Sequence, residues 1–178
     1  HTAVLLGDYV FAASATYVCD TGNIRVVKLF SETIMDLSRG ELQESAHAHG
    51  NTYHIDEYLE RIYFKTGSLF ATAGESGAIL SEASENEVTA LKNYSHKLGL
   101  AFQIIDDIMD FKSDPAFIGK PVGQDLYNGV VTLPLIYESE KPKSKKLIDD
   151  FLQRSNDKNL HKEILASVNA GDSLTRAY

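Results

Sequence analysis

Apolar residues recur at helical spacing along most of the chain, whereas the alternation of apolar and polar residues that marks a strand is scarce. The pattern predicts helices over about 3–19 and 23–45, a helical region over about 56–82, and a long helix from Ser84 to about 112. Ser84 and Glu87 have the spacing of a capping box at its start. Shorter helices are expected near 126–138, where Pro134 kinks or splits the helix, and near 145–153 and 160–168. The predicted fold class is all-α.

Two stretches between these helices have the composition of connections. Residues 114–125 carry proline or glycine at four positions and are expected to form a loop. Residues 140–146 carry four lysines. A solvated linker is the simpler interpretation of this run, and a binding patch is the alternative.

An acidic stripe lies on the otherwise apolar segment LGLAFQIIDDIMDF, residues 98–111. On a helix Asp106 and Asp110 are one turn apart, Asp107 is offset by about 100°, and Gln103 precedes them by one turn. A helix that is apolar nearly all round is expected to be buried, and buried carboxylates need a positive partner. No lysine or arginine lies within a turn on that face, so the stripe predicts a divalent metal, best Mg²⁺. A solvent-exposed acidic stripe is the alternative.

Two further segments could complete such a site. Lys65 and Thr66 lie at a glycine-containing break in the third helical region. Lys120, in the run GKPVGQD over 119–125, follows the acidic stripe by ten residues and could fold back over the metal. A bound metal that faces a diphosphate needs cationic and hydrogen-bonding groups of this kind.

Composition and charge narrow the class of protein. The 178 residues suit one domain, and the formal net charge of −8 disfavours nucleic acid and anionic membranes as partners. No apolar run approaches the roughly 20 residues of a membrane span, so no transmembrane segment is expected. The one cysteine, Cys19, cannot form an intrachain disulfide, which favours a reducing, cytoplasmic location.

Four segments, in order, resemble those of trans-isoprenyl diphosphate synthases, most closely the long-chain (polyprenyl) branch. FQIIDDIMDF, followed by GKPVGQDL and TLPLIY, is similar to the second aspartate-rich region of that family. YFKTGSLFATA resembles its Lys-Thr segment, and AVLLGDYVFAASA resembles the helix after its first aspartate-rich motif. The match runs over about residues 3–138.

The resemblance implies an antiparallel helical bundle of the isoprenoid-synthase type around a central substrate cavity. It implies a transferase that condenses isopentenyl diphosphate with an allylic prenyl diphosphate after Mg²⁺-assisted ionisation, and a homodimer. By the same resemblance Asp106 ligates Mg²⁺, with Asp107 and Asp110 as ligands or supporting groups. Lys65 and Lys120 hold the diphosphate, and Thr66 and Gln103 place oxygen dipoles near the allylic cation.

The chain departs from the family pattern in two respects. The usual Gly-Glu-x-x-Gln reads Gly40-Glu41-Leu42-Gln43-Glu44, and either Gln43 or Glu44 could fill the last role. The first aspartate-rich motif would lie upstream of residue 1, and both ends look cut, so residues 1–178 are expected to be one truncated domain that is inactive alone. A non-catalytic subunit of a heteromeric synthase and, less well supported, a terpene cyclase remain as alternatives.

Overall fold

The computed structural model describes residues 1–47, 50, 53–112, 122–154 and 157–178, and these contain helices and no strand. The elements are α1 (Thr2–Asp20), α2 (Ile24–His47), α3 (Ile55–Ile62), the π-helical turn η1 (Tyr63–Gly67), α4 (Ser68–Leu80), α5 (Glu85–Lys112), α7 (Gln124–Tyr127), α8 (Leu133–Ser139), α9 (Pro142–Gln153), α10 (Lys158–Ala170) and α11 (Ser173–Ala177). The all-α prediction is confirmed.

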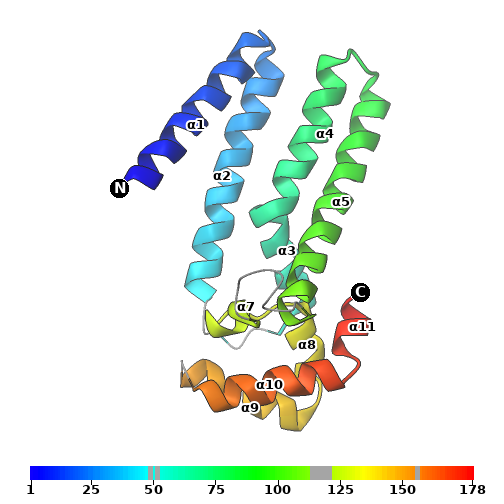
Figure 1. Ribbon diagram of the computed structural model, residues 1–178. Helices are drawn as coiled ribbons and strands as arrows, with labels where there is room; N and C mark the ends of the chain where they lie inside the picture. Colours follow the sequence, from blue (N-terminus) through cyan, green and yellow to red (C-terminus); the bar gives the residue numbers. More distant parts are fainter. Residues whose placement is uncertain (48–49, 51–52, 113–121, 155–156) are drawn as a thin grey trace.

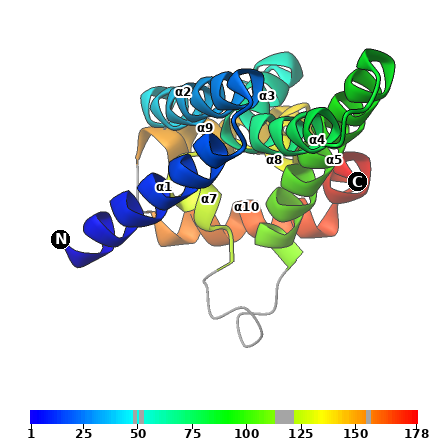
Figure 2. The same ribbon diagram turned by 90° about the horizontal axis from the view of Figure 1, so that it is seen from above.

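Helices α2, α4 and α5 stand side by side, and helices α8 to α11 pack across their lower end (Figures 1 and 2). Buried apolar residues concentrate at that lower end, where α3 and the last turns of α5 meet α7 to α11. Tyr58, Leu135, Ile148 and Phe151 are among the most deeply buried side chains there. The acidic end of α5 therefore enters a well-packed core, whereas the upper bundle is more open.

The third helical region is helical without a break. α3, η1 and α4 follow each other without interruption from Ile55 to Leu80, so Lys65 and Thr66 lie in a π turn and not at a break. Such turns hold one extra residue per turn and occur often at functional sites. The start of α5 is capped as expected on one side: the Glu87 carboxylate accepts hydrogen bonds from the Ser84 amide at 2.8 Å and from its hydroxyl at 2.7 Å.

The structure resolves how Pro134 affects the helix near 126–138 and corrects the interpretation of the lysine-rich stretch as a linker. The helix predicted near 126–138 is split into α7 and α8, and Pro134 lies in the first turn of α8, where its missing N–H costs no helical bond. The lysine-rich stretch is not a linker, because α9 begins at Pro142 and includes most of it. Proline at the first turn starts the helix, and the lysines lie on its solvated side.

A buried carboxylate ties the four C-terminal helices together. Glu138 of α8 is 0% exposed and accepts hydrogen bonds from Ser144 of α9 at 2.6 Å, from Ser167 of α10 at 2.7 Å, and from Ser173 of α11. Lys141 adds an ion pair at 2.9 Å. Burial alone would raise the pKa of Glu138, but these donors lower it to about 2.

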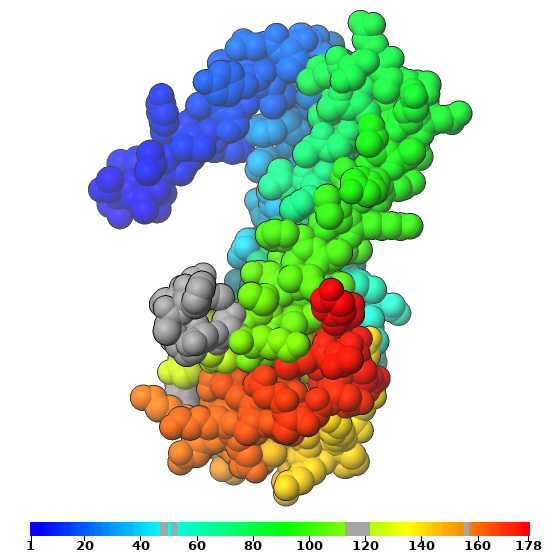
Figure 3. Space-filling model, turned by 45° about the vertical axis from the view of Figure 1, so that its right-hand side comes forward, coloured from blue at the N-terminus to red at the C-terminus, as the bar shows by residue number. Residues whose placement is uncertain are grey.

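Helix α1 corrects the expectation that no segment has the length and composition of a membrane span. It runs antiparallel to α2, where Phe11 stacks on Phe30, and its N-terminal part stands apart from the rest of the molecule (Figures 1 and 3). An 18-residue window of this 19-residue helix has a mean hydropathy of 1.3 and none of its residues is buried, so it is long and apolar enough to cross a membrane by length and composition. Counting only unbroken apolar runs missed this, because Asp8 interrupts the run. One such helix is a weak sign of a span, since core helices and signal sequences have the same composition.

Candidate active site

The acidic stripe occupies the last turns of α5, but α5 is not buried all round. Phe102 is 57% and Met109 45% exposed, and Leu98 and Ile105 lie exposed on the same side. The prediction of a fully buried helix is wrong for this face, because in the described part of the chain no element covers it. The opposite face, with Gln103 and Asp107, packs into the core.

The three aspartates of the stripe have different surroundings. Asp106 is exposed, and its carboxylate has a long contact of 3.5 Å with the Gln103 side-chain nitrogen. Asp107 is 3% exposed and accepts hydrogen bonds from Tyr58 Oη at 2.7 Å and Gln103 Nε2 at 2.9 Å. Burial raises the pKa of Asp107 to about 6, against the two hydrogen bonds, which lower it.

Asp110 holds the start of α7. Its two carboxylate oxygens accept the backbone N–H groups of Gln124 and Asp125, each at 3.1 Å. Gly123 precedes them with φ of +72°, a conformation that favours glycine, and its N–H donates to the Asp110 carbonyl at 2.8 Å. Burial raises the pKa of Asp110, although the backbone hydrogen bonds oppose this. Asp110 thus fixes the position of Asp125 beside the stripe.

Small residues allow the π turn to lie between α2 and α5. A Cβ on Gly40 of α2 would lie 2.7 Å from the Lys65 backbone nitrogen, and a Cβ on Gly99 of α5 would lie 2.9 Å from the Gly67 Cα. Contacts this short exclude any larger residue without a backbone shift. The close approach points Lys65 toward α2 and Thr66 toward α5.

Lys65 pairs with Glu44 of α2, with Nζ 2.7 and 2.9 Å from the two carboxylate oxygens. Burial alone would lower the pKa of Lys65, but Glu44, with smaller contributions from Glu41 and Asp125, raises it, so the ammonium stays charged. The two candidates of the Gly-Glu-x-x-Gln segment lie in different places. Glu44 lies beside Lys65, whereas Gln43 lines two other pockets.

Thr66 and Gln103 form one end of a hydrogen-bonded chain that runs through Asp107 to Tyr58. The Thr66 hydroxyl donates to Gln103 Oε1 at 2.6 Å, and the Gln103 amide nitrogen donates to Asp107. Tyr58 closes the chain from the other side of Asp107. The two predicted residues are therefore in direct contact, and the orientation of the Gln103 amide follows from its partners.

Lys65, Gln103 and Asp107 lie in the wall of a small cavity of about 100 Å³, which we call the carboxylate cavity. It is lined by Glu44, Arg61, Ile62, Lys65, Gln103, Asp106, Asp107, Asp125, Val130 and Thr132. Four of these side chains are carboxylates and two are cations, so the wall is acidic overall. Burial, and then the charges of Asp110 and Asp107, raise the pKa of Asp125 to about 7. The cavity therefore favours a positively charged occupant.

The donor set fits a hydrated divalent cation better than a bare one. Among the described residues no group of three His, Cys, Asp or Glu side chains is placed to hold a metal ion by itself. Asp107 and Asp110 already accept two hydrogen bonds each, which leaves Asp106 as the accessible carboxylate of the stripe. A hard cation that keeps its waters and uses one or two carboxylates suits this arrangement.

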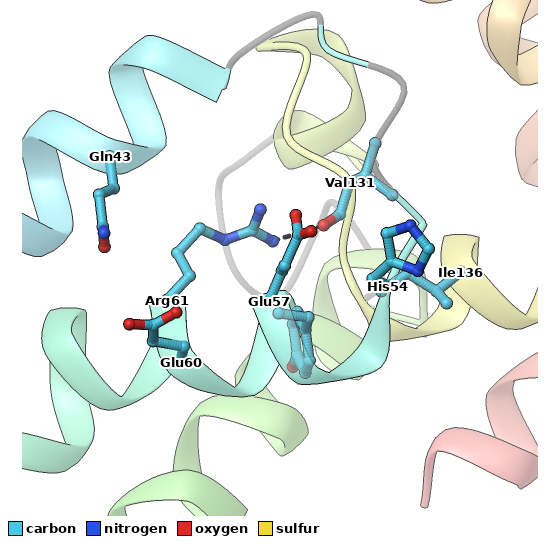
Figure 4. Close-up of a pocket in the computed structure, with 8 residues that line it drawn as sticks. Gln43, His54, Glu57, Glu60, Arg61, Val131 and Ile136 are labelled. Carbon is cyan, nitrogen blue, oxygen red and sulfur yellow. Dashed lines mark hydrogen bonds between the residues drawn. The ribbon is translucent and has the colours of Figure 1, made fainter.

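A second pocket of about 280 Å³, the Arg61 pocket, adjoins the first through Arg61 (Figure 4). Its lining residues are Gln43, His54, Glu57, Tyr58, Glu60, Arg61, Val131 and Ile136. The Arg61 guanidinium donates to the Val131 carbonyl at 2.5 Å and lies 5.6 Å from the centre of the Tyr58 ring. Arg61 therefore separates the two pockets and faces both.

Four predicted residues line the carboxylate cavity: Lys65, Gln103, Asp106 and Asp107. Thr66 is joined to it through Gln103, and Asp110 lies on the same helix but does not line the cavity. Lys120 lies outside the described residues. Sequence reasoning missed Tyr58, Arg61 and Thr132. A signal for the first two was available, because positions 58, 61 and 65 follow the spacing of one helix face that includes Lys65.

Comparisons with known proteins identify relatives of this chain. A family model described as polyprenyl synthetase matches residues 1–168. A prenyl transferase of Synechocystis sp. is 40% identical over 176 residues, which are 98% of this chain and 54% of the relative. The chain therefore spans about half the length of the curated relatives it matches.

Solved structures give the same result for the fold. The heptaprenyl diphosphate synthase of Staphylococcus aureus superposes with a TM-score of 0.95 at 37% identity, over 99% of this chain and 55% of that one. A polyprenyl synthase of Caulobacter crescentus, complexed with calcium and isoprenyl diphosphate, superposes with a TM-score of 0.91 at 26% identity, over 99% and 55% of the two chains.

Proposed function

Because the chain belongs to the polyprenyl synthetase family, we propose that it contributes the allylic half of the active site of a prenyltransferase. The reaction is the condensation of isopentenyl diphosphate with an allylic prenyl diphosphate. One observation carries the proposal: Lys65 of η1 lines the same cavity as Gln103 and the acidic end of α5, although η1 and α5 lie far apart in the sequence.

The residues of this cavity suit the ionisation of an allylic diphosphate. Charge develops on the departing diphosphate and, with opposite sign, on the allylic carbon. A bound Mg²⁺ supplies electrostatic stabilisation of the leaving group. Lys65, held in its charged form, binds a diphosphate oxygen as a fixed cation. Lys120 is proposed for the same role from its sequence motif alone.

We assign the Thr66–Gln103 pair to the positive charge that develops on the allylic carbon. Their side chains are hydrogen-bonded at 2.6 Å, so the two oxygens keep a fixed orientation beside the cavity. Oxygen dipoles that are already oriented stabilise a carbocation without reorganising during the reaction. The homoallylic double bond of isopentenyl diphosphate then attacks the allylic carbon, and a proton is lost to the departing diphosphate.

The three aspartates have different roles at the metal in this proposal. Asp106 is proposed as the direct ligand, because it is exposed and has only a 3.5 Å contact. Asp107 and Asp110 are already bonded to protein donors and hold Gln103 and α7 in place. The complex of the Caulobacter crescentus relative with calcium and isoprenyl diphosphate supports the pairing of a divalent cation with this substrate class.

Homodimerisation and a cytoplasmic location are further parts of the proposal. The large apolar side chains exposed along α1, such as Leu6, Tyr9 and Val10, offer a surface for a second copy. Sedimentation velocity would test this, and a monomer at all concentrations would refute it. The location rests only on the use of a single cysteine. The alternative of a non-catalytic subunit finds no support in the names of the relatives.

A chimera tests the function directly. The 178-residue chain replaces the matching segment of the Staphylococcus aureus heptaprenyl diphosphate synthase, which it covers to 55%. With radiolabelled isopentenyl diphosphate, an allylic diphosphate and Mg²⁺, the chimera should form labelled prenyl products. Asp106→Ala should lower turnover by about 10²–10³-fold, the usual loss on removal of one group that stabilises developing charge. A folded chimera without turnover, or an Asp106 variant of full activity, would refute the proposal.

A further inference from the structure

Among the described residues, Thr132 Oγ1 is the buried side-chain polar atom that has no hydrogen-bond partner. Thr132 is 2% exposed and lines the carboxylate cavity. A buried hydroxyl without a partner is costly, and native proteins leave few such groups. The hydroxyl therefore calls for a partner that enters the cavity.

The local structure explains why the hydroxyl is left over. Thr132 is the N-cap residue of α8, a position at which threonine usually accepts a hydrogen bond from the second or third helical N–H. The second helical residue here is Pro134, which has no N–H, and the Thr132 side chain makes no capping bond. The helix is started by the backbone instead, with the Ile136 N–H donating to the Thr132 carbonyl at 3.0 Å.

The surroundings point to a water molecule that is itself bound to a cation. The cavity of about 100 Å³ exceeds the roughly 15 Å³ that one water needs. Asp106, Asp107 and Asp125 make its wall acidic and attract a divalent cation, and such a cation keeps several waters. Waters on a cation are strong donors and need acceptors, and a hydroxyl oxygen is an acceptor that adds no further negative charge.

We propose that Thr132 is a positioning residue of the cation site: its hydroxyl oxygen accepts a hydrogen bond from a water of a hydrated divalent cation that Asp106 holds. The inference rests on the proposed function, since that function brings the cation to this cavity. It adds a residue from the start of α8, which carries none of the acidic motif. If Thr132 has this role, removal of its hydroxyl should stabilise the empty protein and weaken its binding of the cation.

The experiment uses Thr132→Val, which keeps the shape of the side chain and removes the hydroxyl. Thermal unfolding of the 178-residue chain is followed without ligand and with Mg²⁺ plus inorganic pyrophosphate. Without ligand the variant should melt about 2–4 °C above wild type, because an unsatisfied buried group is removed. With Mg²⁺ and pyrophosphate its stabilisation should be smaller, and titration calorimetry should give a Kd about tenfold weaker. Thr132→Ser keeps the hydroxyl and should restore the affinity.

Thr33→Val is the matched control. The Thr33 hydroxyl is buried in the upper bundle and is satisfied, since it donates to the Leu29 carbonyl at 2.8 Å and shares a hydrogen bond with Thr72 at 2.5 Å. The same substitution there should lower the melting temperature by about 2–4 °C and leave the ligand-induced shift unchanged.

Three outcomes overturn the inference. If Thr132→Val melts lower than wild type without ligand, the hydroxyl already has a partner in the empty protein. If it melts higher but responds to Mg²⁺ and pyrophosphate as wild type does, the hydroxyl does not face the cation. If wild type itself shows no shift with Mg²⁺ and pyrophosphate, and Asp106→Asn changes nothing, the proposed function fails and the inference fails with it.

Discussion

Tyr58→Phe separates the roles of the three aspartates, because it perturbs Asp107 alone. Tyr58 is 1% exposed, and its hydroxyl donates to Asp107 Oδ2 at 2.7 Å. Phenylalanine keeps the ring in the core and removes only the donor. Asp107 then keeps the hydrogen bond from the Gln103 amide, at 2.9 Å. The variant therefore leaves a buried carboxylate with half of its hydrogen bonds.

The expected loss depends on pH. A hydrogen bond to a charged group contributes about 1.5–3 kcal/mol, so Tyr58→Phe should destabilise the fold by about 2 kcal/mol at pH 8, where Asp107 is ionised. The pKa of Asp107 is raised to about 6, so at pH 5 the carboxyl is mostly protonated in both proteins. The loss there should be about 0.5–1 kcal/mol, the value of a neutral hydrogen bond. The destabilisation therefore grows as pH rises from 5 to 8.

Urea denaturation at pH 5 and pH 8 measures both values. Tyr53→Phe is the control, since the Tyr53 hydroxyl also donates to an aspartate, Asp149, at 2.7 Å, but at a half-buried position. Its effect should stay below about 1 kcal/mol and be the same at both pH values. An equal loss for Tyr58→Phe at pH 5 and pH 8, or no loss at pH 8, would contradict the assignment of Asp107 as a buried, protein-bonded carboxylate.

Three other substitutions, one of them with a control, test the helix packing, the buried Glu138 carboxylate and the proposed metal ligand. Gly40→Ala places a Cβ 2.7 Å from the Lys65 backbone nitrogen, so it should lower the free energy of unfolding in urea by about 1–3 kcal/mol and weaken pyrophosphate binding. The control is Gly77→Ala, where a Cβ would have nothing within 4 Å. It should leave binding unchanged and raise the free energy of unfolding by about 0.5–1 kcal/mol. Glu138→Gln should lose about 3 kcal/mol at pH 7. The donors lower the pKa of Glu138 to about 2 from its ordinary 4.5, so this stability is present above pH 4.5 and disappears as pH falls toward 2; a pH-independent loss would refute the buried anion. Asp106→Asn should abolish the Mg²⁺-induced thermal shift while the ligand-free melting temperature stays within about 1 °C, and a retained shift would exclude Asp106 as the ligand.

The sequence predicts the helices well because their signals are local. The spacing of apolar residues and the Ser84–Glu87 cap place the start of α5 within a residue of its position. Pro134 and Pro142 were harder to interpret, since a proline both ends a helix and begins one. In the structure both begin helices, and which role applies depends on the packing of α8 and α9 against the core, which no local pattern records.

The acidic stripe shows where local signals end. The sequence presents Asp106, Asp107 and Asp110 as similar carboxylates on one helix, and their spacing suggests three ligands. Their differences come from partners distant in the chain: Tyr58 bonds Asp107 across 49 positions, and the amide of Asp125 bonds Asp110 across 15. Two of the three carboxylates are thereby used to hold the protein around the cavity, and Asp106 is left accessible. The distant partners, and not the spacing of the motif, thus distinguish Asp106 from the other two aspartates, and they support the proposal of a hydrated cation whose waters need acceptors such as Thr132.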